Sequence, residues 1–321
     1  LRRFRAILDP ARPESAARLD DRSVAEFTRL YFGRSVLDGW VEPFAADASL
    51  CDPDAASRVL FLLHYVARRY ATVGTLRSGL ADLTQALARG SATRLETRVQ
   101  MLEPEGERVS VRVVEPEGER SVESDAVVLA TPAAAARVIA DPLLKTAERD
   151  FLTRARYAAA IVMSVALDRA VVGCATRTRV PEGEGWPVAV IGIQPGGAGA
   201  PAPEGKELAL VTASGRWSQA HMETPDEIVE RDLLGLLQRL HPGSSSASRF
   251  SAVRRYLQAF PRFEVGRYRE IARFRSVQRD LRARGRRLYF AGDYLVGPSL
   301  EGAVTSGFRA ADQIAHDLAI A

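Results

Sequence analysis

The stretch Arg287–Gly307 reads RLYFAGDYLVGPSLEGAVTSG, and it predicts an apolar strand, a tight acidic turn and a helix of small residues. Leu288–Ala291 has the composition of a central parallel strand. Gly292 lets the backbone turn closely past a ligand, and Asp293 follows at the carboxyl end of the strand, where ligands bind in open α/β sheets. A carboxylate there is suited to accept hydrogen bonds from sugar-like hydroxyls. The stretch therefore predicts a ligand site at a sheet edge.

The helix that follows begins with almost bare turns. Pro298 and Ser299 are suited to set its start, and small residues then leave the backbone N–H groups accessible. The helix dipole favours negative charge at that end, which suits a large anionic or electron-accepting cofactor. The alternative is that small residues only allow the helix to pack closely on a sheet. The small residues of these turns are Gly302, Ala303, Ser306, Gly307 and Ala310.

The composition is that of a globular protein. The chain has 321 residues, 46% of them apolar and 26% charged, which is more than one core usually holds, so we expect two interleaved lobes. The formal charge is only +4 and no basic run stands out. The sequence therefore gives no indication of nucleic-acid binding.

Upstream, helical and strand patterns alternate. Ser23-Val-Ala-Glu26 is a capping box, and the first 70 residues read as mostly helical. Two copies of EPEGER separate three predicted strands and are expected to form the turns of a meander. The run Asp125–Ala130 is apolar without alternation, which predicts burial on both faces. The meander strands are expected at Thr97–Met101, Arg108–Val114 and Ser121–Ala130.

The remaining segments continue this mixture. Helices are expected over Asp38–Phe44, Asp54–Tyr70, Leu80–Leu87, the Ala-rich segment after Pro132, Thr224–His241 and Leu300–Leu318. Strands are expected over Tyr157–Leu167, Trp186–Ile193, Glu207–Ser214 and Val253–Phe260, and loops over Gln194–Gly205 and Ser244–Ser248.

The cysteines and histidines carry no metal or disulfide pattern. Cys51 and Cys174 lie far apart, which fits a reducing, cytoplasmic location, and the four histidines lack metal-ligand spacing. The run Val59–Val66 is too short to span a bilayer. It is expected in the core, with a peripheral membrane face or a greasy substrate channel as alternatives.

FAGDYLVGPSLEGAVTSGFRAA resembles the C-terminal flavin-binding motif of the FAD-dependent amine oxidase and protoporphyrinogen oxidase superfamily. Asp21–Gly33, Gly74–Leu87 and DAVVLATP at Asp125–Pro132 resemble further family segments in the same order, and AFPRFEVG at Ala259–Gly266 resembles a segment of protoporphyrinogen oxidases. The resemblance implies an α/β fold with FAD as cofactor. A Rossmann-like FAD lobe of the glutathione-reductase type, here incomplete, would interleave with a mixed-sheet and helical substrate lobe.

The resemblance also assigns residues to the cofactor. Asp293, with Gly292, would bind the ribityl and pyrophosphate region, and Val99 would hold adenine through its backbone. Thr131 and Pro132 would line the cofactor cleft. At the helix start, Ser299 is counted with the cofactor site, and the residues expected near the isoalloxazine are Gly302, Ala303 and Val304.

One departure from the family pattern is large, because the opening strand and GxGxxG turn are missing. The chain starts with Leu1, and we expect it to be N-terminally truncated. The expected division is 1–72 as helical part of the substrate lobe, 73–140 as FAD-lobe segment with the meander, 141–285 as substrate-binding lobe and 286–321 as C-terminal FAD-binding segment.

The resemblance leaves several functions open. Ser299 stands where amine oxidases carry an aromatic cage residue, which disfavours amine oxidation. Dehydrogenation by hydride transfer to flavin N5, as in protoporphyrinogen oxidases, fits best, with an apolar or tetrapyrrole-like small molecule as substrate and oxygen or a quinone as acceptor. A flavin amine oxidase or a carotenoid desaturase-like enzyme is the alternative. A truncated, non-catalytic fragment unable to hold FAD is the alternative of another class. No catalytic residue, metal site or oligomeric state is assigned.

Overall fold

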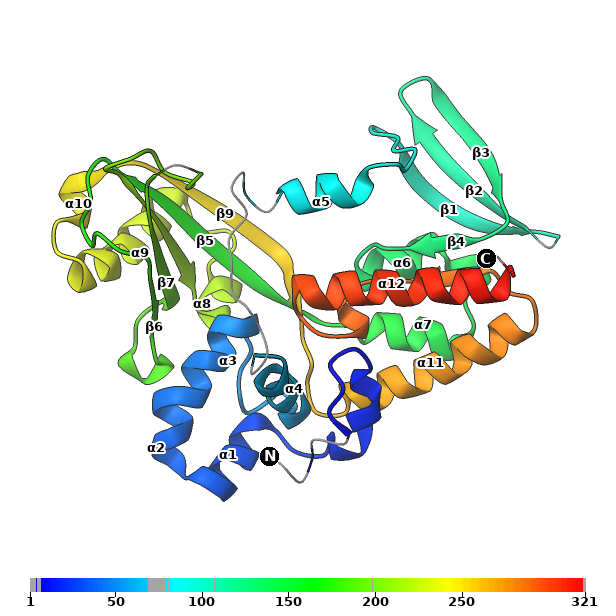
Figure 1. Cartoon of the computed structure of the whole chain (residues 1–321), viewed down its shortest axis with the longest axis horizontal. Coiled ribbons are helices and arrows are strands. Elements are labelled where there is room, and N and C mark those ends of the chain that lie inside the picture. Colours follow the sequence, from blue (N-terminus) through cyan, green and yellow to red (C-terminus); the bar gives the residue numbers. More distant parts are fainter. Residues whose placement is uncertain are drawn as a thin grey trace.

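The computed structural model describes residues 4, 7–68, 79, 81–106, 108–197 and 199–319. Figure 1 shows the five-stranded sheet on one side of the molecule, and the three-stranded meander with α6, α7, α11 and α12 on the other. The helices are η2 (Pro13–Leu19), α1 (Val24–Phe32), α2 (Arg34–Val36), η3 (Leu37–Val41), α3 (Glu42–Ser49), α4 (Arg58–Arg68), α5 (Ala81–Ala88), α6 (Ala133–Ile139), η4 (Asp141–Leu143), α7 (Thr146–Thr153), η5 (Glu182–Glu184), α8 (Gly215–Ala220), α9 (Asp226–Leu240), α10 (Ser244–Ala247), α11 (Arg267–Ala283), η6 (Asp293–Leu295) and α12 (Leu300–Asp317). The strands are β1 (Arg98–Glu105), β2 (Arg108–Glu115), β3 (Gly118–Ser124), β4 (Val127–Leu129), β5 (Tyr157–Leu167), β6 (Thr176–Arg179), β7 (Val188–Pro195), β8 (Glu207–Ala213), β9 (Ser248–Pro261) and β10 (Leu288–Phe290).

The largest sheet is antiparallel throughout, in the order β6-β7-β8-β5-β9. Its strand β8 alternates strictly between buried and half-buried residues, the pattern of a sheet that packs on one face. The buried side chains of β5, β7 and β8 form one core with those of α9, here called the second core. The predicted strand Tyr157–Leu167 is confirmed with the same bounds.

The predicted meander is confirmed, in the order β1-β2-β3. Each EPEGER copy contains a tight hairpin, which Glu105 and Arg108 close at the end of the first copy and Glu115 and Gly118 close at the start of the second. The expected single strand Ser121–Ala130 is wrong, because the chain leaves the meander after β3 and then starts β4 in another sheet.

The strand β4 pairs in parallel with β10, and the two form a two-stranded sheet of three residues each. Burial on both faces was predicted here and is wrong for Val128, which is 39% exposed, whereas Leu129 is 4% exposed. Successive strand residues point to opposite faces, and only one face of β4 is packed.

The N-terminal helices pack with the meander and the parallel pair. The capping box is confirmed, since Ser23 Oγ accepts from the amide of Glu26 at 3.0 Å and Glu26 Oε2 accepts from the amide of Ser23 at 2.9 Å. Val59–Leu63 of α4 is buried, which confirms its core role. These helices, β1, β4, β10, α7 and α11 share the first core. The domain boundaries themselves stay a prediction.

Several elements were not predicted from the sequence, among them β6, α8, α10 and α11. Ser244–Ala247 forms α10 rather than a loop, because Gly243 adopts a φ of +95° and Gln238 Oε1 accepts from the amide of Ser245 at 2.8 Å. The long helix α11 was not anticipated. Asp20, far away in sequence, caps it by accepting from the amides of Tyr268 at 2.8 Å and Arg269 at 3.2 Å.

Within the described residues no helix is both long and apolar enough to cross a membrane, and no group of three potential metal ligands is found. Cys51 and Cys174 are free thiols.

Candidate cofactor site

The site is built at one edge of the parallel pair. Leu288 is in register with Val127 and Phe290 with Leu129, and the amide of Ala291 donates to the Leu129 carbonyl at 3.0 Å. Both strands therefore end at the same carboxyl edge. Thr131 follows β4 and Asp293 follows β10, so the structure brings these two predicted residues to one edge.

A fixed turn follows β10. Gly292 has a φ of +153°, and a Cβ there would run into the ring of Tyr294, so glycine is required. The amide of Gly292 donates to Ser306 Oγ at 2.7 Å, and Ser306 Oγ donates to the Ala303 carbonyl at 2.7 Å. The turn is thus tied to α12 by one buried hydroxyl.

The start of α12 is as predicted. Ser299 is its N-cap, and Ser299 Oγ accepts from the amide of Gly302 at 3.0 Å. A Cβ on Gly302 would overlap the carbonyl oxygen of Gly297, so glycine allows the helix to begin against this turn. Ala303 and Val304 are half-buried in the first turns. The remaining first-turn amides have no acceptor inside the helix, which leaves them to a ligand or water.

The carboxyl group of Asp293 has a pKa above its ordinary value. Burial raises its pKa from 3.8 to about 6, against the opposing effect of hydrogen bonds from the amides of Tyr294 and of Asp293 itself. Desolvation disfavours the charged form. A carboxylate in this state gains from any hydroxyl that donates to it.

The structure adds three residues that sequence reasoning missed. Tyr157 Oη, at the start of β5, accepts from the amide of Ala133 at 2.9 Å. Burial raises the pKa of Tyr157, and the negative charge of Asp293 adds to that effect. Tyr294 is buried directly after Asp293, and burial raises its pKa well above the ordinary value. Arg267 is 6% exposed, and its guanidinium lies 4.0 Å from the Phe151 ring centroid.

Two buried hydroxyls here have no partner in the described part of the chain, namely those of Thr131 and Tyr294. An unsatisfied buried hydroxyl is costly, and its presence at the end of a strand suggests that a ligand completes it. The sequence could have indicated Tyr294, because it directly follows Asp293. Tyr157 and Arg267 carried none, because their proximity depends on long-range packing.

The other predicted residues lie around this edge. Pro132 is exposed and is the N-cap of α6. Val99 lies in β1, half-buried next to a bulge in its pairing with β2, so an adenine contact would come from the meander. The Gly74–Leu87 element lies partly outside the described residues, since only Gly79 and 81–87 of it are described.

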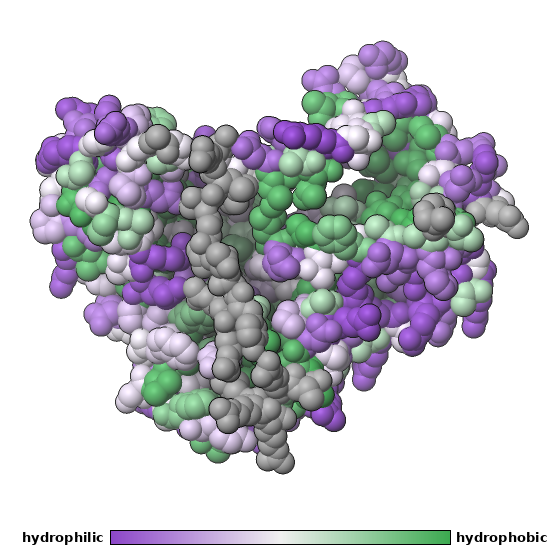
Figure 2. Space-filling view, viewed as in Figure 1, coloured by the Kyte–Doolittle hydropathy of each residue, from purple (hydrophilic) through white to green (hydrophobic). Residues whose placement is uncertain are grey.

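The surface around these elements is apolar and hollowed. Figure 2 shows hydrophobic side chains around a hollow between the α5 and meander part and α12. The exposed large apolar side chains of α5, β4 and α12 include Leu87, Val128, Leu300 and Phe308.

The sequence model of flavin-containing amine oxidoreductases matches residues 3–315. The chain belongs to this family. It is a flavin oxidoreductase with FAD as its cofactor. The resemblance inferred from the sequence is thereby confirmed at the level of the superfamily.

Solved structures with the same fold include both oxidase types. A putative protoporphyrinogen oxidase from Exiguobacterium sp. is 18% identical, with a TM-score of 0.68, and the match covers 93% of this chain and 67% of the other. Cyclohexylamine oxidase from Brevibacterium oxydans is 17% identical, with a TM-score of 0.72 over 99% of this chain and 73% of the other. An engineered putrescine oxidase is 18% identical, with a TM-score of 0.72 over 98% and 74%. No curated protein matches the chain.

The residues of the edge fit the cofactor. The unpartnered hydroxyl of Thr131 and the desolvated carboxyl of Asp293 suit a sugar-alcohol chain, which both donates and accepts hydrogen bonds. The open start of α12 suits the electron-rich side of a flavin ring. The individual cofactor contacts stay predictions.

Proposed function

We propose that this protein dehydrogenates an apolar, tetrapyrrole-like small molecule in the manner of protoporphyrinogen oxidases. The observation that carries the proposal is Ser299. It stands where amine oxidases are expected to carry a caging aromatic residue, and its hydroxyl is engaged in capping Gly302. A site without that ring has lost one wall that would hold an amine by cation–π attraction.

Bound FAD would supply the acceptor for a hydride removed from a substrate carbon. The protein's own residues supply position and charge. Asp293 would accept hydrogen bonds from the ribityl chain, and the first amides of α12 would stabilise negative charge on the reduced ring. The bonds of Ser306 to Gly292 and Ala303 would hold these two groups in one arrangement.

The ionisable groups of the edge support hydride transfer without a protein base. Burial raises the pKa of both Tyr157 and Tyr294, so neither phenol accepts a proton at neutral pH. Asp293 is the group with a pKa closest to neutrality, and the proposal assigns it to the cofactor.

The apolar surface supports the substrate class. Leu300, at the start of α12, is 47% exposed, and Phe308 on the same helix is 64% exposed. Contiguous exposed apolar groups on a hollowed face mark binding sites more often than ordinary surface. Peripheral membrane contact and a cytoplasmic location stay predictions.

The substrate test uses the FAD-loaded protein without oxygen. Protoporphyrinogen, cyclohexylamine and putrescine are added separately, and the absorbance of oxidised flavin is followed. We expect protoporphyrinogen alone to bleach it. Bleaching by an amine, with none by protoporphyrinogen, would instead assign the site to amine oxidation.

A matched pair of variants tests the role of Ser299. Ser299→Thr keeps a capping hydroxyl and should keep the activity, whereas Ser299→Ala should destabilise the start of α12 by about 1 kcal/mol. Equal loss of turnover in both variants, with the helix intact, would assign Ser299 to substrate contact instead.

A further inference from the structure

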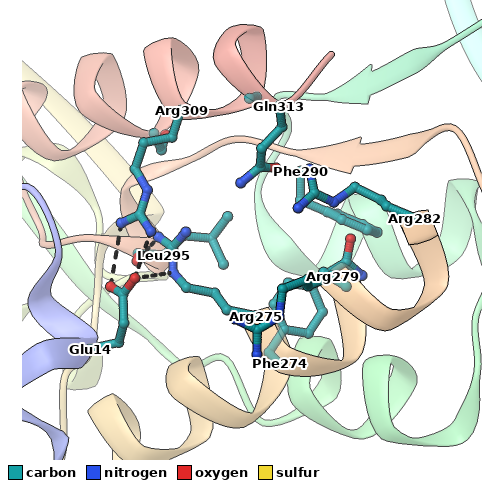
Figure 3. Close-up of a pocket in the computed structure, with 12 residues that line it drawn as sticks. Glu14, Phe274, Arg275, Arg279, Arg282, Phe290, Leu295, Arg309 and Gln313 are labelled. Atoms are coloured by element: carbon teal, nitrogen blue, oxygen red, sulfur yellow. Dashed lines mark hydrogen bonds and ion pairs between the residues drawn. The ribbon is translucent and has the colours of Figure 1, made fainter. Parts of the chain in front are cut away.

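A cavity of about 190 Å³ lies between α11 and α12, on the side of the Gly292 turn where Asp293 does not line it. Figure 3 shows side chains from both helices pointing into it, with Phe290 of β10 and Leu295 also on its wall. Its polar lining is unusual for its size, because four arginines share it with a single carboxylate. The polar lining residues are Glu14, Arg275, Gln278, Arg279, Arg282, Ser306, Arg309 and Gln313.

The carboxylates at this cavity do not balance the arginines. Glu14 Oε1 is shared, lying 2.6 Å from Arg309 Nη2 and 3.3 Å from Arg275 Nε. Arg282 pairs outside the lining with Asp317 at 3.2 Å. Four guanidinium groups thus face two carboxylates.

Arg279 is the arginine of this cavity that has no carboxylate partner in the described chain. It donates to Ser276 Oγ at 3.4 Å, and no carboxylate of the described chain forms an ion pair with it. Gln278 and Arg286 both bond Glu148, so that carboxylate is already occupied. Two positive charges therefore remain without a counter-charge.

The helix geometry concentrates these charges instead of spreading them. Arg275, Arg279 and Arg282 follow each other at spacings of four and three residues, which puts them on one face of α11. Like charges at that spacing destabilise a helix. Ser306, Arg309 and Gln313 repeat the spacing on α12. The two stripes meet across the cavity, and an anion between them would relieve the repulsion.

Burial makes the crowding more costly. The side chain of Arg275 is 18% exposed and that of Arg282 is 14% exposed, and Arg282 Nε is buried without a hydrogen-bond partner in the described chain. Burial lowers the pKa of Arg275 to about 10, and the charge of Arg309 acts in the same direction, although Glu14 opposes it. Partly desolvated cations with free donors interact strongly with an incoming anion.

We propose that this cavity binds a phosphoryl dianion, either free phosphate or the terminal phosphate of a small monoester. The guanidinium fork matches phosphate oxygens in pairs. The cavity is smaller than the roughly 300 Å³ at which ordinary small-molecule pockets begin, which selects a compact anion. Ser306 connects the cavity to the Gly292 turn, but Asp293 does not line it.

The test is isothermal titration of the full chain with inorganic phosphate in chloride buffer of matched ionic strength. We expect one saturable site per chain, with the same affinity in the presence and absence of FAD. Arg279→Ala should weaken phosphate binding about tenfold, the effect of one charge-assisted hydrogen bond. Arg279 is exposed, so its replacement should leave the fold intact, and circular dichroism checks this.

The matched control is Arg273→Ala, an exposed arginine of the same helix that does not line the cavity. It should bind phosphate like the wild type. A second titration with glycerophosphate separates the two ligand sources, since equal affinity identifies a monoester and weaker binding identifies free phosphate. Absence of a saturable site would overturn the proposal. Equal losses in Arg279→Ala and Arg273→Ala, or displacement of phosphate by FAD, would do the same.

Discussion

The five-stranded sheet and the parallel pair β4–β10 differ in what their residues do. Buried residues of β5, β7 and β8 close a core with α9, and Ile191 and Val211 are fully buried there. The parallel pair has three residues a strand, Val128 is 39% exposed, and an unpartnered hydroxyl and a desolvated carboxyl stand at its end. The buried face of the first region is filled by apolar side chains, whereas the second region ends in polar groups that its own short strands do not cover.

This difference supports the proposal that the cofactor binds at the carboxyl edge of β4 and β10. A sheet face that is filled by apolar side chains leaves no room for a ligand, whereas an edge with unsatisfied polar groups gains hydrogen bonds when a ligand arrives. Changes in the sheet should therefore affect folding, and changes at the edge should affect cofactor binding.

The largest effect is expected in the sheet. Ile191→Ala removes a fully buried side chain and should lower the free energy of unfolding by about 2–5 kcal/mol. Urea titration measures it. Leu257→Ala is the control, because Leu257 is 69% exposed on β9, and its change should stay within about 0.5 kcal/mol. Similar costs in the two variants would contradict the assignment of the core.

Asp293→Asn should give the next largest effect, on FAD affinity. Losing a hydrogen bond to a charged group costs about 1.5–3 kcal/mol, so the dissociation constant should rise at least tenfold at pH 8. In the wild type, FAD affinity should fall as pH drops through about 6, because the bound form needs the carboxylate. The variant should lose this dependence, and FAD titration across pH measures both.

The same pKa predicts a stability effect without cofactor. The folded pKa of about 6 lies above the ordinary value of 3.8, so the folded chain binds this proton more tightly. The resulting stability is present below pH 3.8 and is lost as pH rises to about 6. Asp293→Asn should remove that contribution. A difference in stability between wild type and variant that stays constant across this window would contradict the burial argument.

Two glycines of α12 give a matched pair. Gly302→Ala forces a Cβ against Gly297, whereas Gly307→Ala meets nothing within 4 Å. The first should cost about 1–3 kcal/mol of stability and weaken FAD binding. The second should stabilise by up to about 1 kcal/mol through helix propensity. Thermal unfolding separates them, and equal behaviour would show that the start of α12 is not tightly fitted.

Thr131→Val should have the smallest effect on stability and on FAD affinity. It tests whether the hydroxyl at the end of β4 lacks a partner until FAD binds. Without FAD, removing an unpartnered buried hydroxyl should leave stability unchanged or slightly raised. With FAD, affinity should fall by about 0.5–1.5 kcal/mol. A loss of stability in the absence of FAD would mean that the hydroxyl already has a partner.

The turn after β10 and the start of α12 could be predicted from the sequence because the information for them is local. Gly292, Ser299 and Gly302 act through neighbours within a few residues, and glycine and capping serine have specific local roles. The structure confirms the turn and the helix start at these positions.

Features that depend on distant partners were not predictable in the same way. Asp20 caps α11 from 248 residues away, and the break between β3 and β4 depends on which sheet each strand joins. The arginine cavity needs two helices to meet. No local pattern in the sequence indicates that Arg275, Arg279 and Arg282 lie opposite α12.

The most direct measurement of the central claim is FAD retention by the purified chain. The protein is incubated with FAD and desalted, and the flavin absorbance is compared with the protein concentration for the wild type, Asp293→Asn and Gly307→Ala. The account predicts near-stoichiometric retention in the wild type and Gly307→Ala, and marked loss in Asp293→Asn. Equal retention in all three folded proteins would contradict it, because the carboxyl edge of β4 and β10 would then not be the cofactor site.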